Sequence, residues 1–154
     1  MMNKSVTFGL AALVLAGLGL GAWTMGEPKQ AEAAPMVVYK SPTCGCCGAW
    51  VDHVRESGFE VEVKEVFDLE PIKAAAGVPG QMESCHTAMI DGYVIEGHVP
   101  AEDIKRLLAE KPDVKGIAVP GMPIGSPGME MGNEKEPYVS VLFGDKGYEV
   151  FAEH

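Results

Sequence analysis

Apolar positions along the chain predict several short strands after residue 35. The run Met36–Tyr39 is apolar and enters a turn, as a buried strand does. Residues 59–64 alternate between apolar and charged side chains, the period-two pattern of a half-buried strand. Two more apolar runs flank Asp91-Gly92, a dipeptide typical of tight hairpin turns. The pattern therefore predicts two strands that precede a hairpin.

Three segments carry apolar residues at helical spacing. Trp50, Val51 and Val54 share one face of the first predicted helix, which begins at the cysteine cluster and ends at Gly58. The other two helices are predicted from Asp68 to about Ala76 and in the segment after Pro100 and before Lys111. Strands and helices are thus expected to alternate in the first two thirds of this region.

The remaining segments complete the predicted fold. Residues 116–132 are rich in Gly, Pro and Met without periodicity and predict a loop, and residues 138–151 predict a closing hairpin. The order β-α-β-α-β-β-α, followed by a loop and a hairpin, is typical of an α/β, thioredoxin-like fold. We expect a mixed central sheet with flanking helices and a C-terminal β-hairpin. In such a fold, the N-terminus of the first helix carries the reactive site.

The N-terminal segment predicts export. Residues 5–26 carry no charge, Lys4 precedes them, and Ala31-Glu32-Ala33 fits the small-x-small pattern of signal peptidase sites. We predict a signal peptide over residues 1–33 and a mature domain over residues 34–154, located in the periplasm. The alternative is an uncleaved anchor, because residues 6–25 just reach the about 20 residues that span a bilayer.

Charge excludes one class of function. Among the 154 residues, 12 Lys and Arg face 22 Asp and Glu, which gives a formal net charge of −10. A chain this acidic lacks the positive surface that a phosphate backbone requires, so we predict no nucleic-acid binding. Residues 1–33 carry two basic and two acidic residues, so the whole net charge belongs to the predicted mature domain.

Cysteine spacing is the most informative chemical feature. Three of the four cysteines lie within four residues, in Cys44-Gly45-Cys46-Cys47, and the fourth is Cys85. A purely structural disulfide framework fits poorly, because closing a loop of two to four residues removes little entropy from the unfolded chain. Two functional interpretations remain open: thiol–disulfide exchange and the binding of a soft metal.

Each interpretation explains part of the cluster. Cys44 and Cys47 have the C-x-x-C redox spacing, at a helix N-terminus that stabilises a thiolate. Cys46 has no evident role in exchange, whereas closely packed thiolates favour Cu(I) or Zn(II). Adjacent cysteines cannot easily turn toward one tetrahedral ion, so Cys46 and Cys47 favour bridging between ions. We therefore expect a multinuclear copper site in preference to zinc.

Cys85-His86 provides a second half of this site. The dipeptide stands just before the strand that opens the predicted hairpin. In a thioredoxin-like fold this turn packs against the N-terminus of the first helix and normally carries a cis-proline, at the position that His86 occupies here. We therefore expect Cys85 and His86 to face Cys44 and Cys47 and to act as ligands.

Four separated motifs resemble those of the CopG-type copper-resistance proteins, a family of exported, predicted metal-binding domains. The resemblance covers nearly all of residues 36–154. Its motifs are Cys44-Gly-Cys-Cys47 followed by Gly48 and Trp50, Ser84-Cys-His-Thr87, Glu96-Gly-His-Val-Pro100, and the stretch 121–129.

The resemblance implies a thioredoxin-like domain that holds a cysteine-bridged copper cluster and acts in periplasmic copper tolerance. It also implies interconversion of Cu(I) and Cu(II), which would make the protein a copper oxidoreductase, and exchange with other periplasmic copper-handling or redox proteins. The family's ligands correspond here to the cysteines and the Cys-His pair, namely Cys44, Cys46, Cys47, Cys85 and His86. A passive zinc or copper store remains a further alternative.

Other soft or nitrogen donors extend the candidate set. His98 lies in a family motif, where it could bind metal or cap the following helix. Met129 is the preferred thioether ligand among the loop methionines, ahead of Met122 and Met131. His53 is expected on the surface of the first helix, and His154, at the last position, is expected to be frayed.

Overall fold

The computed structural model describes residues 35–154. The predicted signal peptide or anchor, residues 1–33, lies outside the described residues. Within the part of the chain that is described, no helix is both long enough and apolar enough to cross a membrane.

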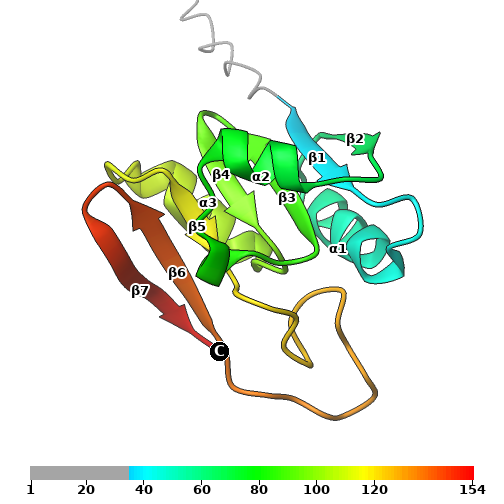
Figure 1. Ribbon diagram of the computed structural model, residues 1–154. Coiled ribbons are helices and arrows are strands. Elements are labelled where there is room, and N and C mark those ends of the chain that lie inside the picture. Colours follow the sequence, from blue (N-terminus) through cyan, green and yellow to red (C-terminus); the bar gives the residue numbers. More distant parts are fainter. Residues whose placement is uncertain (1–34) are drawn as a thin grey trace, which may run out of the picture. The chain divides into compact units, whose positions relative to one another are not determined.

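Strands and helices alternate as the sequence pattern predicts (Figure 1). The elements are β1 (Met36–Lys40), α1 (Gly45–Glu56), β2 (Val61–Glu65), α2 (Glu70–Ala76), β3 (His86–Ile90), β4 (Tyr93–Glu96), α3 (Ala101–Glu110), β5 (Gly116–Ala118), β6 (Val139–Gly144) and β7 (Gly147–Glu153). A single 3-10 turn, η1 (Gly80–Met82), lies between α2 and β3. The predicted element order is confirmed except at β5.

The prediction of a loop beginning at residue 116 is wrong for its first three residues. Gly116–Ala118 forms β5, which pairs in parallel with β4 and antiparallel with β6. All three residues are buried, so the strand shows no alternation of polar and apolar side chains. A side chain at Gly116 would collide with the carbonyl oxygen of Val94, which explains a glycine inside this strand.

All strands belong to one mixed sheet with the order β2-β1-β3-β4-β5-β6-β7. β1 pairs in parallel with β2 and antiparallel with β3, so the β1–α1–β2 crossover and the β3–β4 hairpin are joined through the β1–β3 pair. The expectation of an α/β fold with a mixed sheet, flanking helices and a C-terminal hairpin is confirmed.

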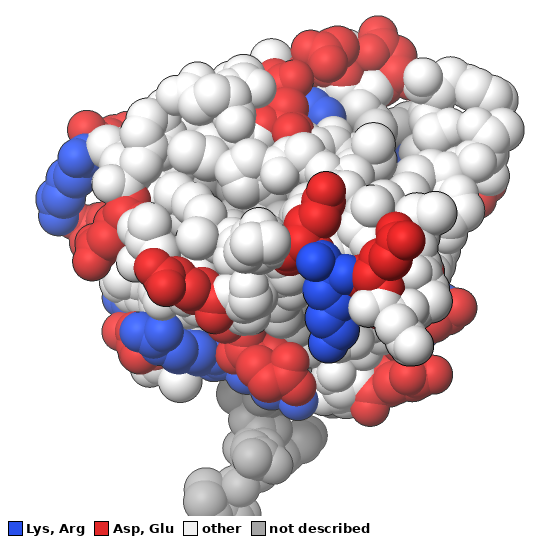
Figure 2. Space-filling model, turned by 90° about the horizontal axis from the view of Figure 1, so that it is seen from below, with Lys and Arg blue, Asp and Glu red and all other residues white. Residues whose placement is uncertain are grey.

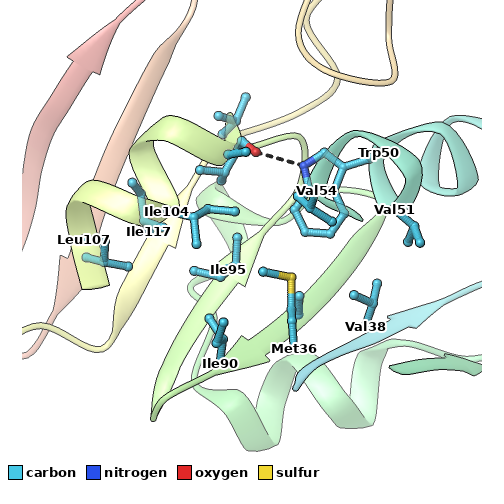
Figure 3. Packing of buried hydrophobic residues seen from close by; sticks show 14 of the residues in the cluster. Met36, Val38, Trp50, Val51, Val54, Ile90, Ile95, Ile104, Leu107 and Ile117 are labelled. Carbon is cyan, nitrogen blue, oxygen red and sulfur yellow. Dashed lines mark hydrogen bonds between the residues drawn. The ribbon is translucent and has the colours of Figure 1, made fainter. Parts of the chain in front are cut away.

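The main core lies between the sheet and helices α1 and α3 (Figure 3). Trp50 and Val54 of α1 and Ile104 of α3 are fully buried against apolar residues of the central strands. The indole Nε1–H of Trp50 donates a hydrogen bond of 2.9 Å to the carbonyl oxygen of Val99, just before α3. This bond ties the helix of the cysteine cluster to the β4–α3 connection.

Helix α2 covers the opposite face of the sheet, over a smaller apolar cluster that includes Val94 and Phe143. Lys73 of α2 is also buried, although it is charged. Along β3 and β4, successive side chains point to opposite faces, so Thr87 and Glu96 face α2 while His86 faces α1.

The C-terminus is ordered, so the expectation that His154 is frayed is wrong. The backbone of His154 pairs with Tyr138, and the two rings stack with centroids 4.7 Å apart. Its Nε2 lies 2.8 Å from a carboxylate oxygen of Asp103 on α3. These contacts fix the end of the hairpin to α3, which sequence position alone does not reveal.

Charged side chains of both signs are interspersed on one face of the molecule. On the face shown in Figure 2, basic side chains stand beside acidic ones and form no continuous patch on that face. The exposed ion pairs of the described residues include Arg106 with Glu110 on α3. Such pairs contribute little to stability.

Candidate metal centre

The cysteine cluster occupies the first turn of α1. Strand β1 ends at Lys40, and the amide N–H of Cys44 donates to the carbonyl oxygen of Ser41 at 3.1 Å, which closes the turn before the helix. Cys44 is the N-cap residue, Cys46 is half-buried, and Cys47 is fully buried. The helix dipole therefore acts on these sulfurs at its positive end.

Cys44 and Cys47 form a disulfide, while Cys46 and Cys85 are free thiols. The Cα atoms of Cys44 and Cys47 are 5.4 Å apart, because residues three apart lie on one side of a helical turn. This pairing leaves Cys85 unpaired and joins the two cysteines that carry the redox spacing. The site is therefore in an oxidised form, in which two of the four candidate cysteine ligands are bonded to each other.

Cys85 faces the cluster from just before β3, as predicted. Its Sγ lies 3.9 Å from the Sγ of Cys46, and the Cys46 Sγ lies 3.5 Å from that of Cys44. The Sγ of Cys47 contacts the carbonyl oxygen of Cys85 at 3.6 Å. The sulfurs of Cys44, Cys46, Cys47 and Cys85 all lie within 4.8 Å of one another. Four sulfur donors from two distant segments thus share one small volume.

Two imidazoles border the same sulfur. His98 Nε2 lies 2.9 Å and His86 Nδ1 lies 3.5 Å from the Sγ of Cys85. The Nδ1 of His98 lies 2.8 Å from the carbonyl oxygen of Pro127, which can only accept a hydrogen bond. His98 therefore carries its proton on Nδ1, and its Nε2 presents a lone pair to Cys85.

His86 is completely buried beneath the site. Its ring packs against Trp50, with centroids 4.4 Å apart, and meets the ring of His98 edge-on at 5.0 Å. Among the described residues, the His86 Nε2 has no hydrogen-bond partner. Buried imidazole nitrogens normally have a partner, so the ring of His86 holds a donor or acceptor that residues 35–154 do not use.

Burial controls the protonation of all three groups. Desolvation raises the pKa of Cys85 to about 12, and the neighbouring Cys46 adds to the rise. Burial also lowers the pKa of His86 well below its usual range and lowers that of His98, where the hydrogen bond to Pro127 partly opposes the shift. At neutral pH the thiol keeps its proton and both imidazoles are neutral. A metal that binds Cys85 must therefore displace a proton.

The loop between β5 and β6 lies against the first turn of α1. A Cβ at Gly128, whose φ is +83°, would lie 2.7 Å from both the Cys46 carbonyl oxygen and the Trp50 amide nitrogen. Only glycine allows the loop backbone to approach the helix so closely. Its neighbour Pro127 then supplies the carbonyl that orients His98.

Met129 follows Gly128 in this loop and is half-buried. Among the described residues, no hydrogen bond joins its sulfur to the cysteine cluster. Met122 and Met131 are more than half exposed, at 53% and 59%. The structure therefore brings six of the seven predicted ligands together and places Met129 in a segment that packs beside them.

A buried carboxylate fixes the residues on both sides of Cys85 and His86. One oxygen of Glu96 accepts the amide N–H of Ser84 at 2.7 Å, and the other accepts the hydroxyl of Thr87 at 2.7 Å. The ammonium of Lys73 pairs with the same carboxylate and also donates to Thr87 at 3.0 Å. Desolvation raises the pKa of Glu96, and its hydrogen bond with Lys73 opposes that rise.

The sequence interpretation did not identify Lys73, Glu96 or Gly128 as part of the site. A usable signal exists for Glu96, which ends an otherwise apolar strand inside one of the motifs. Lys73 lies in a helix with exposed neighbours, and its partner is 23 residues away. No local pattern marks such a pair.

His53, the histidine expected on the surface of the first helix, has a structural role. His53 is half-buried, and its Nε2 accepts the amide N–H of Ala101 at 3.1 Å, at the start of α3. His53 therefore provides the helix cap that the sequence analysis considered for His98, and His98 instead faces the sulfurs.

These donors suit a soft metal ion. Thiolates and neutral imidazoles favour Cu(I) and Zn(II) over Mg(II) or Ca(II), which prefer oxygen ligands. The hydrogen bond from His98 to Pro127 is the type of support that orients a metal-binding imidazole. The same cysteines also carry a disulfide at a helix N-terminus, which suits thiol exchange.

Known proteins are similar to this chain over almost their whole length. Two solved structures described as copper resistance protein CopG, in Form 1 and Form 2, are each 45% identical to this chain. The alignment covers 80% of this chain and 98% of Form 1, with a TM-score of 0.75, and 78% of this chain and 97% of Form 2, with a TM-score of 0.74.

A family profile described as "Protein of unknown function, DUF411" matches residues 82–129. That range contains Cys85, His86, His98 and the loop glycine Gly128, and it excludes the cluster at the start of α1. No curated protein sequence matches this chain.

Replacing Glu96 tests the importance of the buried ion pair. The substitution Glu96→Ala leaves the Lys73 ammonium buried without its partner, so we expect a loss of about 3–5 kcal/mol in the free energy of unfolding, measured with urea. Glu110→Ala is the matched control, because it removes one partner of the exposed Arg106–Glu110 pair and should cost only about 0–1 kcal/mol. Equal losses in both variants would contradict this assignment.

Proposed function

We propose, from the premise that this chain belongs to the family of the copper resistance protein CopG, that it binds several copper ions through bridging cysteine thiolates. Four cysteine sulfurs within 4.8 Å of one another are the observation that carries this proposal. When Cys44 and Cys47 are reduced, the four sulfurs and His98 together supply more donors than a single tetrahedral ion needs.

The proposed activity is the interconversion of Cu(I) and Cu(II) within this cluster, as part of copper resistance. Thiolate sulfur favours Cu(I), and imidazole nitrogen also binds Cu(II), so a mixed donor set accommodates both oxidation states. Copper is the substrate or cargo here, and other copper-handling or redox proteins are the proposed exchange partners. Met129, in the adjacent loop, is proposed as a supplementary Cu(I) ligand.

The proposed fold assignment is thioredoxin-like. The strand order β2-β1-β3-β4, in which β1 is parallel to β2 and β3 is antiparallel to both β1 and β4, supports it. The position of the cysteines after β1 and of Cys85 before β3 is also consistent with this assignment. Strands β5, β6 and β7 then extend the sheet beyond that unit.

Copper loading tests the cluster. Fully reduced protein, titrated with Cu(I) without oxygen, should bind more than one copper per chain and develop the luminescence of a Cu(I)–thiolate cluster, which zinc does not produce. Cys46→Ser should lower the stoichiometry by at least one copper per chain. Ala49→Ser adds the same hydroxyl one turn later on α1 and should leave the stoichiometry unchanged. A ratio of one or less that Cys46→Ser does not alter would contradict the proposal.

The disulfide favours a second candidate function, thiol–disulfide exchange. The half-buried Cys44 is more accessible than the fully buried Cys47. A thiolate of an external dithiol would attack the Cys44 sulfur, forming a mixed disulfide and releasing the Cys47 thiolate. The second thiol of the dithiol then displaces Cys44, so two electrons and two protons pass to the protein and the dithiol becomes a disulfide.

This second candidate predicts disulfide-reductase turnover without metal. Cys44→Ser should abolish turnover, because it removes the accessible sulfur, while Cys85→Ser and a copper chelator should leave the rate within about twofold. The measurement is reduction of a disulfide substrate with a dithiol as electron donor. Turnover that requires copper or Cys85 would count against exchange as an independent activity.

Export to the periplasm is proposed from the N-terminal segment alone. N-terminal sequencing of the protein recovered from cells should begin at Ala34 if the predicted signal peptide is removed. A chain that still contains Lys4 and fractionates with membranes would instead support an uncleaved anchor.

A further inference from the structure

We infer that residues 124–136, in the loop between β5 and β6, form a lid over His98, and that His154, the last residue of the sequence, holds this lid closed. The lid moves away as one body when the side-chain contacts of His154 break, and it then uncovers the buried imidazole. The inference adds control of access to the proposed copper function, and only this purpose rests on that function.

The lid covers a part of the site that solvent does not reach. His86 and His98 are completely buried. The carbonyl oxygen of Pro127, within the lid, lies 2.8 Å from the Nδ1 of His98. Gly128 rests on the first turn of α1, beside the Cys46 carbonyl oxygen. Moving the lid away from α1 therefore exposes the ring of His98.

The lid is closed on itself at a narrow neck, formed by Ile124 and Glu136. The amide N–H of Glu136 donates to the carbonyl oxygen of Ile124 at 2.8 Å, and the carboxylate of Glu136 accepts the amide N–H of Ile124 at 2.9 Å. Inside the lid, the Gly125 amide donates to Met129, and the Met129 amide donates to Ser126, at 3.0 and 2.8 Å. Compact loops whose ends meet are packed by their own residues, so the lid can move as a unit.

Burial holds the outer part of the lid only weakly. Ser126 and Pro127 are buried, but all of residues 130–136 are exposed. A hollow of about 400 Å³ lies at the neck and is lined by Gly125, Glu136 and His154, among others. Segments with few buried apolar contacts open locally at low free-energy cost. The attachment of the lid therefore depends on specific contacts near its neck.

His154 makes such contacts where the loop enters β6, next to the C-terminus (Figure 1). Its backbone exchanges two hydrogen bonds with Tyr138, of 2.9 and 3.3 Å, and the two rings stack with centroids 4.7 Å apart. The carboxylate of Asp103, which is buried on α3, lies 2.8 Å from the His154 Nε2 and accepts its hydrogen. Tyr138 is therefore connected to α3 through His154.

A single rigid residue links this contact to the neck. Glu136 ends the lid, Pro137 follows it, and Tyr138 is the next residue. The pyrrolidine ring of Pro137 fixes its φ angle, so the backbone between the neck and Tyr138 has little freedom to adjust. Releasing the side chain of His154 from Asp103 therefore frees the neck as well.

The group around Asp103 has the geometry of an anchor and not that of a catalytic triad. The hydroxyl of Ser140 is buried and donates to the Asp103 carboxylate at 2.6 Å. The Nε2 of His154 lies 2.8 Å from the same carboxylate and 3.4 Å from that hydroxyl. In a triad, the two ring nitrogens face different partners, whereas here one nitrogen faces both. Ser140 thus fixes the carboxylate that binds His154.

The test measures how fast diethyl pyrocarbonate modifies each histidine of the full-length, metal-free protein, by mass spectrometry of its peptides. His154→Ala keeps the backbone pairing but removes the ring, so we expect the rate at His98 to rise at least about fivefold. His86 is the internal control, because its ring packs against Trp50 of α1. The rate at His86 should stay within about twofold, since only unfolding of the body of the protein would expose it.

Two further variants separate the role of His154 from a general loss of stability. His154→Gln keeps an N–H donor within reach of Asp103 and should restore most of the protection of His98. His53→Ala removes the imidazole that accepts the amide N–H of Ala101 at the start of α3. It should lower the free energy of unfolding in urea and leave the rate at His98 unchanged. Amide hydrogen exchange over residues 124–136 should rise in His154→Ala alone.

The outcomes also separate the lid from the copper-cluster proposal. If His154→Ala leaves the rate at His98 unchanged, or raises the rate at His86 equally, the lid is refuted. A rise at His98 alone, reversed in His154→Gln, supports it. All of these rates are measured without copper. Reduced protein that binds no more than one Cu(I) would therefore refute the cluster and leave the lid in place.

Discussion

The carboxylate of Glu96 makes contacts on both sides of the Cys85-His86 dipeptide. The other sulfurs form a shared site with Cys85 only if that dipeptide stays in place. Its two oxygens bind the backbone of Ser84 and the hydroxyl of Thr87. A buried ion pair is an expensive way to gain stability. Here the Lys73–Glu96 pair, on the α2 side of the sheet, holds the turn that carries Cys85 and His86. The pair therefore connects α2 to the cysteine–histidine site beneath α1.

Two further contacts complete the frame. Trp50 joins α1 to the segment before α3 through Val99, and Gly128 allows the loop to rest on the first turn of α1. His98 therefore lies between a helix, a strand end and a loop that are each held by other parts of the protein. A site assembled from such segments needs little ordering when an ion binds, which favours affinity.

Much of this arrangement could be predicted from the sequence. Period-two strands and the Asp91-Gly92 hairpin predicted the element order, because these signals are local. The meeting of Cys85 with the cluster was predicted from the likeness of that order to a thioredoxin-like fold, in which the turn before the hairpin packs against the first helix. β5 was missed because Gly116–Ala118 is short and buried throughout. The pairing of Lys73 with Glu96 was missed because it depends on how α2 lies on the sheet. The disulfide depends on redox state, which no residue pattern encodes.

The close approach at Gly128 has a consequence for comparing relatives of this protein. A chain could keep all of the cysteines and both buried histidines and still lose the arrangement, because any side chain at position 128 would push the loop from α1. The Pro127 carbonyl would move with it, and His98 could then adopt its other tautomer. Assigning metal-binding ability from ligand residues alone would misclassify such a relative, whereas including this glycine as a criterion would identify it correctly.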